Sequence, residues 1–403
     1  MSFSEWREVR LGDVCTYAST KVSVSEVSED NYISTENMLP NKSGVTKSSG
    51  LPTVGSVTKY SAGNVLVSNI RPYFRKIWYA DRDGGCSNDV LVFDINDSKT
   101  LDSKFLFYCL SNDVFFDYVM AGSKGTKMPR GDKGAIMKYP VLLPSLPEQK
   151  AIAATLSALD DMIELNNQIN KTLEEMAQAI FKSWFVDFEP FKDGEFEESE
   201  LGLIPKGWRV GVLEDIAFIN TETINPQNYP ETFFEHFSIP LFDEGKFSAF
   251  EKGEVIKSNK YVIDSSCMLF SKLNPQFKRV FRPFCKTSKA ICSTEFMVYK
   301  AKKPIYNNYI YSTLCSGSFH QFVMQNVTGT TNSRQRAIPK NTLNFKMLIP
   351  DENALSSYNQ IISGIFNIMQ RIPEDNKLLS SIRDTILPKL MTGEIRVPVE
   401  EVV

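Results

Sequence analysis

The sequence repeats itself over about half of its length, and this repeat constrains the fold more than any other feature. Residues 6–14, from Trp6-Arg7 to Asp13-Val14, return at residues 208–216, from Trp208-Arg209 to Asp215-Ile216, at an offset of 202. Residues 105–126 return at 309–330 at an offset of 204, and later pairs match at 206. Solenoids and propellers repeat every 20 to 50 residues or so. The much longer period therefore predicts two copies of one domain. The offset between the copies grows from 202 to 206, which indicates a few short loop insertions in the second copy.

Composition limits the class of protein. The chain has 403 residues, a net charge of −3 and 42% apolar residues, which is ordinary for a globular protein of two or three domains. Seven cysteines without a C-x-x-C pair indicate reduced thiols rather than a disulfide framework or a zinc site. The first residues lack a basic start and an apolar core, and no apolar run approaches the ~20 residues that span a bilayer. We therefore expect a cytoplasmic protein with no signal peptide and no membrane partner.

Local patterns predict an α+β fold. Short apolar runs such as Val65-Leu66-Val67, bounded by Gly, Asn and Asp, are typical of strands. Residues 105–120 have helical spacing. We predict the following order: a β-rich domain over 1–146, a long helix over 147–186, an acidic solvated linker over 187–206, a second β-rich domain over 207–350, a second long helix over 351–392, and a tail over 393–403.

Two apolar stripes predict that the long helices pack together. The first helix begins at Pro147-Glu148, and apolar residues follow at steps of three and four for about 30 residues, which one helix cannot bury alone. The second copy keeps the stripe at an offset of 206. Pro373 lies within it and predicts a kink or a break. The candidate packing residues are Leu156, Leu159, Ile163, Leu173, Ile362, Ile365, Leu379 and Ile382.

Candidate catalytic motifs are weak. The chain has two histidines, His236 and His320, and neither belongs to a nucleophile motif. The tetrapeptide Asn274-Pro275-Gln276-Phe277 is similar to the catalytic loop of adenine-N6 methyltransferases, but the chain has no G-x-G sequence for S-adenosylmethionine. A β-turn begun by Asn-Pro is the alternative. An enzyme of this kind and a scaffold that binds no DNA are the competing classes.

Basic and aromatic residues gather at equivalent places in both copies. One cluster spans residues 271–303, with nine Lys or Arg against Glu295, and its counterpart lies at 71–76; the other is a Gly-rich loop before the last strand of each domain. Arg can pair with guanine, Asn or Gln with adenine, and Lys with phosphate. A solvated surface is the alternative. The candidate DNA-binding residues are Arg71, Tyr73, Arg75, Lys76, Lys124, Lys127, Arg130, Lys278, Arg279, Thr330, Asn332, Arg334 and Arg336.

Three motifs resemble the specificity subunits of type I restriction–modification enzymes. These are the helix entry Leu-Pro-Ser-Leu-Pro-Glu-Gln at 143–149, the sequence Leu-Gly-Leu-Ile-Pro-Lys-Gly-Trp at 201–208, and residues 386–395. The Gly-rich loop with Arg130 or Arg334 is also similar. The second helix departs from the pattern, because it lacks the Glu-Gln entry and contains Pro373.

The resemblance implies a DNA-recognition subunit without catalysis. Two target-recognition domains would each bind one half of a split site in double-stranded DNA, and the long helices would pack antiparallel as a spacer. Two modification subunits, which bind S-adenosylmethionine and methylate adenine, and motor-nuclease restriction subunits would be the partners. The chain itself would bind no cofactor and no metal.

Overall fold

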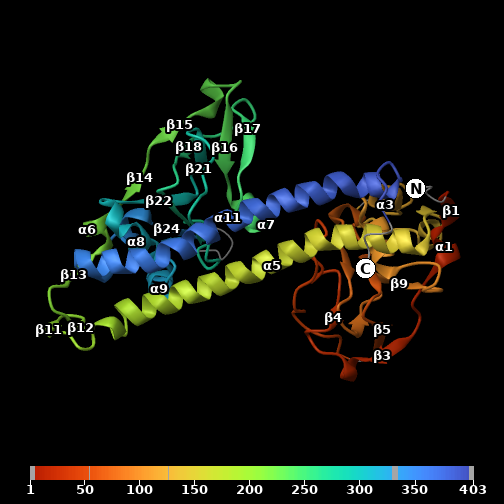
Figure 1. Ribbon diagram of the computed structural model, residues 1–403, viewed down its shortest axis with the longest axis horizontal. Coiled ribbons are helices and arrows are strands. Elements are labelled where there is room, and N and C mark those ends of the chain that lie inside the picture. The colour runs from red at the N-terminus through yellow and green to blue at the C-terminus, as the bar shows by residue number, and fades with distance from the viewer. Residues whose placement is uncertain (1–4, 54, 126, 329–334, 399–403) are drawn as a thin grey trace. The chain divides into compact units, whose positions relative to one another are not determined.

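The computed structural model describes residues 5–53, 55–125, 127–328 and 335–398. The chain divides into two compact units, one made of Met1–Asp161 with Ser380–Val403 and the other of Met162–Leu379. Each unit contains one β-rich domain and segments of both long helices, drawn in yellow and blue in Figure 1. The first unit therefore combines two separate stretches of sequence, whereas the second unit is one continuous stretch.

The first β-rich domain consists of two four-stranded sheets and a two-stranded pair. Their orders are β2-β9-β6-β7, β3-β5-β8-β4 and β1-β10. The elements are β1 (Arg7–Arg10), α1 (Leu11–Val14), β2 (Cys15–Tyr17), β3 (Lys21–Ser23), η1 (Val24–Glu26), β4 (Tyr32–Ile33), β5 (Ser56–Tyr60), β6 (Val65–Ser68), η2 (Pro72–Phe74), β7 (Ile77–Tyr79), β8 (Gly84–Cys86), β9 (Val90–Ile95), α2 (Ser103–Ser111), α3 (Asp113–Ala121), α4 (Lys133–Ile136) and β10 (Pro140–Leu143).

The segment predicted as one helix over 105–120 forms two. Asn112 has an extended backbone, and its side chain accepts a hydrogen bond from the Val114 amide at 3.2 Å, so it begins α3 as an N-cap. Asp102 begins α2 in the same way, accepting from the Phe105 amide at 2.9 Å. The apolar faces of both helices lie in the core of the first unit with β6 and β9.

The second β-rich domain repeats this plan. Its sheet orders are β14-β22-β19-β20, β15-β18-β21-β16-β17 and β13-β25. Its elements are β13 (Arg209–Val212), α6 (Leu213–Ile216), β14 (Ala217–Asn220), β15 (Thr223–Ile224), η4 (Pro226–Asn228), β16 (Phe233–Phe237), α7 (Ile239–Gly245), β17 (Ala249–Lys252), β18 (Lys260–Val262), β19 (Met268–Ser271), β20 (Val280–Phe281), β21 (Ala290–Ser293), β22 (Phe296–Ala301), η5 (Pro304–Tyr306), α8 (Asn307–Leu314), α9 (Gly317–Gln325), β23 (Val327–Thr328), β24 (Arg336–Ala337), α10 (Pro339–Thr342) and β25 (Lys346–Ile349).

Strand registers confirm that the two domains are copies. Cys86 on β8 pairs with Ile33 in parallel and with Thr58 in antiparallel, and Cys292 on β21 pairs with Phe237 and Tyr261 in the same two ways. The second copy differs by the insertion of α7 and β17, which extends its second sheet to five strands.

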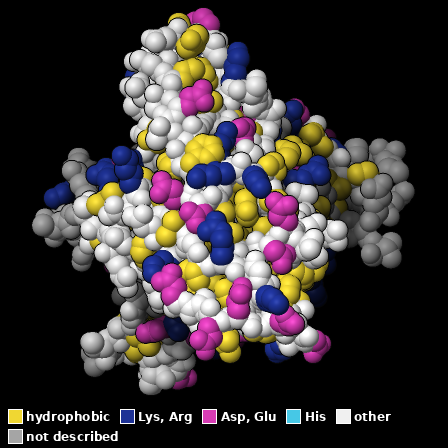
Figure 2. Space-filling view, turned by 90° about the vertical axis from the view of Figure 1, so that its left-hand side faces the viewer, with side chains coloured by type: hydrophobic (Ala, Val, Ile, Leu, Met, Phe, Trp, Pro, Cys, Tyr) yellow, Lys and Arg dark blue, Asp and Glu magenta, His cyan; other side chains and the backbone are white. Residues whose placement is uncertain are grey.

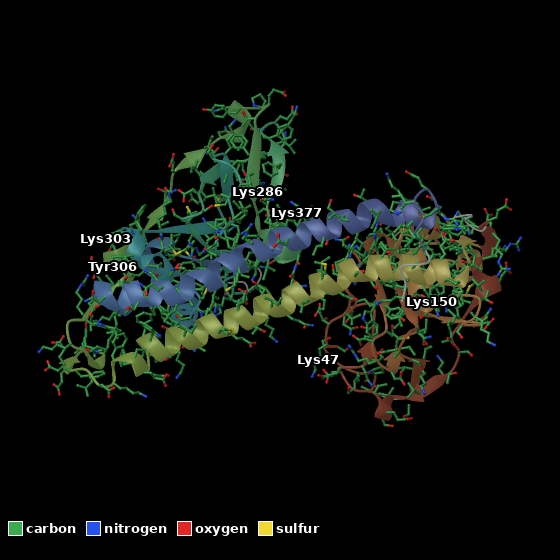
Figure 3. The ribbon with its side chains drawn as sticks, viewed as in Figure 1. Lys47, Lys150, Lys286, Lys303, Tyr306 and Lys377 are labelled. Atoms are coloured by element: carbon green, nitrogen blue, oxygen red, sulfur yellow. The ribbon has the colours of Figure 1, made fainter. Side chains whose placement is uncertain are left out.

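Residues of the inserted segment contact the long helices within the second unit. Lys246 at the end of α7 pairs with Glu174 at 2.8 Å, and the Lys377 ammonium donates to the Ser248 carbonyl. Lys286, outside the insertion, pairs with Glu374, and Figure 3 shows Lys286 and Lys377 on this side of the domain.

The long helices are α5 (Leu146–Phe185) and α11 (Glu352–Met391), each 40 residues long. Within the first unit Asp160 pairs with Arg383 at 2.6 Å, while Glu148 pairs with Arg396 at 2.5 Å, in the tail that follows α11. Residue numbers along α5 rise as those of its partners in α11 and the tail fall, so the two segments are antiparallel. In the second unit Asn166 donates to Asn376 at 2.8 Å, and Phe185 contacts Tyr358 with ring centroids 4.8 Å apart, in the same sense.

Pro373 does not break α11, which continues as a helix on both sides of it. Its ring lines a small hollow together with Asn170, Phe366 and Met369, where the second domain and the two helices meet within the unit. The predicted break is therefore wrong.

The predicted packing residues differ in burial. Leu156 and Ile362 are fully buried in the cores of their units, and Leu159, Ile163, Leu173, Ile365 and Leu379 are half-buried. Ile382 is 41% exposed, so its assignment to the helix interface is wrong. The next residue, Arg383, faces α5 instead, because its guanidinium pairs with Asp160.

The acidic segment interpreted as a linker has regular structure. Residues 187–206 form η3 (Glu189–Phe191) and an antiparallel hairpin of β11 (Phe196–Ser199) and β12 (Gly202–Pro205). The ring centroids of Phe188 and Phe191 lie 5.7 and 5.0 Å from that of Trp208. The many acidic residues of the segment had favoured a solvated linker, so this aromatic packing was not predicted. Along the described parts of the chain, no helix has the length and apolar character needed to cross a membrane.

Candidate nucleic-acid interface

A left-handed turn displays aromatic side chains in the first domain. Arg71, which follows β6, has φ +50°, and Pro72 then begins the one-turn helix η2. A positive φ is strained for a residue with a side chain, and such strain is concentrated at functional sites. Tyr73 is 47% exposed and Phe74 37% exposed, and the Lys76 ammonium lies 5.7 Å from the Phe74 ring centre. The turn thus presents flat apolar rings next to positive charge.

The second domain builds the same turn after β19. Asn274 has φ +48°, Pro275 follows, and Phe277 is 58% exposed. The Arg279 guanidinium lies 5.3 Å from the Phe277 ring centre. The Asn274-Pro275 pair is therefore a turn, as the simpler interpretation predicted, and His320 holds it through a 2.7 Å contact with the Pro275 carbonyl.

A narrow hairpin lies against each turn. In the first domain Lys124 and Arg130 exchange backbone hydrogen bonds of 2.9 and 3.0 Å, and the Arg71 amide donates to the Pro129 carbonyl at 2.8 Å. In the second domain β23 pairs with β24, and the Asn274 amide donates to the Gln335 carbonyl at 2.9 Å. The paired segments of each hairpin are thereby held beside the left-handed turn of their domain.

Each hairpin carries an arginine paired with an acid that directly precedes a strand of the core sheet. Arg130 Nη2 lies 3.1 Å from Asp89 Oδ1, and Arg336 binds Glu295 through two contacts of 3.0 Å. The backbone matches as well, because Ile70 bridges to Arg130 and Leu273 bridges to Arg336. The equivalent of Arg130 is therefore Arg336, whereas the sequence had paired it with Arg334.

These two arginines are placed to exchange partners. Arg130 and Arg336 keep 57% and 47% of their side chains exposed. An exposed ion pair contributes about 0–1 kcal/mol, so transfer of the guanidinium to a guanine edge costs little. The carboxylate meanwhile fixes the direction of the fork, which favours bidentate pairing. The sequence did not predict a role for Asp89 or Glu295. Both residues directly precede the last strand of the core sheet in their domain, at an offset of 206, and this repeat could have identified them.

Most other predicted basic residues of the first domain are also paired. Arg75 lies 2.8 Å from Asp113, and Lys124, which is 84% exposed, lies 3.2 Å from Asp132. The Lys76 ammonium donates to the Thr35 carbonyl at 2.6 Å, and burial together with the Arg71 charge lowers its pKa. Lys76 therefore packs under the Phe74 ring rather than reaching outward. Lys127 is exposed.

The basic cluster of the second domain is neutralised in part, because some of its residues pair with carboxylates. Arg279 binds Asp243 through contacts of 2.6 and 2.9 Å and is 14% exposed, so the predicted DNA contact at this residue is not supported by its position. The Lys278 ammonium donates to the Cys315 carbonyl. Lys286, Lys300 and Lys303 pair with Glu374, Asp264 and Glu352.

The acids that neutralise this cluster are distant in sequence, so a local count of charge could not reveal them. Figure 2 shows one face on which Lys and Arg alternate with Asp and Glu among apolar side chains, without a continuous basic surface. Thr330, Asn332 and Arg334 lie outside the described residues.

The chain is similar to one family of proteins throughout. Residues 3–175 match the model of the type I restriction modification DNA specificity domain. The chain is 28% identical to the MjaIX specificity subunit of Methanocaldococcus jannaschii over 73% of this chain and 69% of that protein. It is 24% identical to the HindI specificity subunit of Haemophilus influenzae over 97% of this chain and the whole of that protein. The crystal structure of a type I restriction–modification S subunit from M. genitalium shares the fold, with a TM-score of 0.59 at 14% identity and 96% coverage of both chains.

Proposed function

We propose that this chain, which belongs to the specificity-subunit family of type I restriction–modification enzymes, recognises double-stranded DNA in two halves, one half by each β-rich domain. The observation that carries the proposal is the repeated construction of turn, hairpin and paired arginine at Arg130 and Arg336. One construction could be an ordinary surface loop. Two of them, preserved while the surrounding sequence has diverged, favour a common task for both domains.

The chemistry of recognition follows from the exposed groups. A hairpin is narrow enough to enter a major groove, where an arginine fork can bind guanine N7 and O6. Asp89 or Glu295 could accept a hydrogen bond from cytosine N4 once its arginine has moved to the base. The rings of Phe74 and Phe277 supply apolar contact beside these groups. Different loop sequences in the two domains would then specify different half-sites.

The long helices are the proposed docking surface for methyltransferase subunits. In the second unit apolar side chains remain exposed on both helices, which is unusual for a solvated helix pair and favours a protein partner. They are Leu165, Ile169, Met176, Ile361, Ile368 and Leu378. Two modification subunits, with S-adenosylmethionine bound in them, would supply the methyl transfer, and restriction subunits would complete the complex in the cytoplasm. In this proposal the chain contributes no catalytic group and holds no cofactor.

Methylation mapping tests the proposal. The chain is co-expressed with its modification subunit in cells that lack other adenine methylation, and the modified sites are sequenced. We expect a split motif with a fixed spacer. Arg130→Ala is expected to relax one half of the motif and Arg336→Ala the other, at a cost of about 1–3 kcal/mol each.

Three results would contradict the proposal. Relaxation of both halves by Arg130→Ala would show that the domains do not act independently. Methyl transfer by the purified chain alone would favour an enzyme. A complex that assembles normally with the modification subunit, but binds no duplex in an electrophoretic mobility-shift assay, would favour a scaffold.

A further inference from the structure

A hollow beside the hairpin of the first domain carries two positive charges that no acid neutralises. It encloses about 330 Å³ and is lined by Tyr17, Lys21, Thr58, Asn88, Lys133 and the strand residues 90–92. None of these side chains is acidic. Neither lysine is among the candidate DNA-binding residues predicted from the sequence.

The surroundings of the two ammonium groups leave their charge available. Lys21 Nζ donates to Thr58 Oγ1 at 3.0 Å and to Asn88 Oδ1 at 3.4 Å, and both acceptors are neutral. Lys133 Nζ lies 6.0 Å from the centre of the Tyr17 ring. Across the described residues, no carboxylate lies within 4.0 Å of either ammonium, in contrast to Lys124, Arg130 and Arg336.

Neighbouring residues link the hollow to the proposed DNA-binding hairpin. Asn88 immediately precedes Asp89, which binds Arg130. Lys133 begins α4, and its carbonyl accepts a hydrogen bond from the Tyr17 hydroxyl at 3.1 Å, which joins the hairpin side of the hollow to β2. A duplex seated on the Arg130 hairpin would therefore bring its backbone to these lysines.

The second domain lacks this arrangement. Strand register places Thr223 at the position of Lys21, because Thr223 pairs with Tyr261 as Lys21 pairs with Thr58. Pro339 begins α10 where Lys133 begins α4. Ile219 takes the place of Tyr17, since each pairs with the equivalent residue of the central strand. Both charges and the aromatic wall are thus missing from the second copy.

We propose that Lys21 and Lys133 form a binding site for backbone phosphates of the DNA half-site that the first domain recognises, a site that the second domain does not have. The inference rests on the proposed function and adds an asymmetry to it. The first domain would hold DNA by charge as well as by base contacts, and the second would depend more on its hairpin.

The test measures how binding depends on salt. The full chain in complex with its modification subunit is titrated with its mapped duplex and with a scrambled duplex at several salt concentrations. Each phosphate contact contributes about 0.9 to the slope of log K against log salt. Lys21→Gln/Lys133→Gln is expected to lower the slope by about 1.8 on both duplexes and to leave the methylated motif unchanged.

A matched variant controls for net charge. Lys59→Gln/Lys99→Gln removes two exposed lysines of the same domain, one of them adjacent to Thr58 on β5, and is expected to leave the slope unchanged. A short duplex truncated to the first half-site should show the effect of the Lys21 and Lys133 changes, whereas a short duplex truncated to the second half-site, which the second domain binds, should not.

Acylation of lysines in the wild-type complex gives a readout without variants. The duplex is expected to protect Lys21 and Lys133, whereas inorganic phosphate at the same salt concentration is not. Equal protection by inorganic phosphate would assign the site to a free anion and overturn the inference. So would an unchanged slope in the double variant, provided that the wild type still prefers its mapped duplex. Loss of that preference in the wild type would instead refute the proposed function.

Discussion

Replacing Glu148 by alanine tests how the start of α5 is stabilised in the first unit. Glu148 is 1% exposed. Its carboxylate accepts hydrogen bonds from Arg396 Nε at 2.5 Å, from Arg396 Nη2 at 2.9 Å and from Trp6 Nε1 at 3.1 Å. The Arg396 guanidinium also lies 5.0 Å from the centre of the Trp6 ring. One carboxylate therefore joins α5, the segment before β1 and the segment after α11.

In the second unit, apolar and aromatic residues take the place of this ion pair. Ala354 stands at the equivalent place, 206 residues after Glu148, and is buried. The Phe191 ring lies 5.0 Å from the Trp208 ring, where Arg396 contacts Trp6 in the first unit. Trp208 Nε1 is buried without a hydrogen-bond partner among the described residues, as expected when the carboxylate is absent.

The repeat thus provides the design of a double-mutant cycle. Removing one partner of a buried ion pair costs about 3–5 kcal/mol, because the other charge is left unpaired. Arg396 retains 22% exposure of its side chain, so Glu148→Ala is expected at the lower end, near 3 kcal/mol. Glu148→Ala/Arg396→Phe imitates the second unit and should recover most of the loss, because an apolar replacement of a buried pair is often neutral.

Thermal unfolding, followed by hydrogen exchange in the first turn of α5, measures the effect on the first unit separately from the second. For a unit of this size 1 kcal/mol corresponds to about 2–4 °C, so the single variant should melt roughly 6–12 °C lower. A double variant that is less stable than Glu148→Ala, with additive losses, would refute the reasoning.

Three further predictions concern stability and the helices. Leu156→Asp should destabilise the first unit by several kcal/mol because it buries an unpaired charge, whereas Ile382→Asp, at an exposed position, should change the melting temperature little. Burial would raise the pKa of Asp264, but hydrogen bonds from Lys300 and Ser266 outweigh it and lower the pKa to about 2. Its stabilising contribution is therefore complete above pH 4 or so and lost as the pH falls through 2, and Asp264→Asn should remove this acid-dependent part of a urea titration. Duplicating one helical turn at both residues 163–166 and 376–379 lengthens the pair by ~6 Å and should add one or two base pairs to the methylated motif's spacer, while a duplication in α5 alone should break the Asn166–Asn376 contact and abolish assembly.

The sequence was informative where the repeat preserved apolar residues. The match between residues 105–126 and 309–330 predicted two copies, because core positions tolerate few changes of size and polarity. The same match could not align the hairpins, since their loops differ in length. Arg130 was paired with Arg334 in sequence, whereas the backbone bridges to Ile70 and Leu273 pair it with Arg336.

Charge was the least predictable property. A run of nine basic residues suggested one cationic surface, but Asp243, Glu352 and Glu374 approach it from elsewhere in the chain. Pairing of this kind depends on tertiary contacts that a local window does not contain. The proximity of Lys21 and Lys133 was not predicted for the same reason, because only the folded strands bring these two lysines to one hollow.

The discontinuous composition of the first unit has a consequence for its biosynthesis. Leu387, Leu390 and Met391 are core residues of that unit, together with Leu11 and Phe105. A ribosome delivers these residues only after all of residues 162–379 have been made. The second unit can therefore complete its core before the first, so the order of maturation reverses the order of translation. During that interval the apolar side chains that later pack against the end of α11 stay exposed, and such transient exposure favours aggregation.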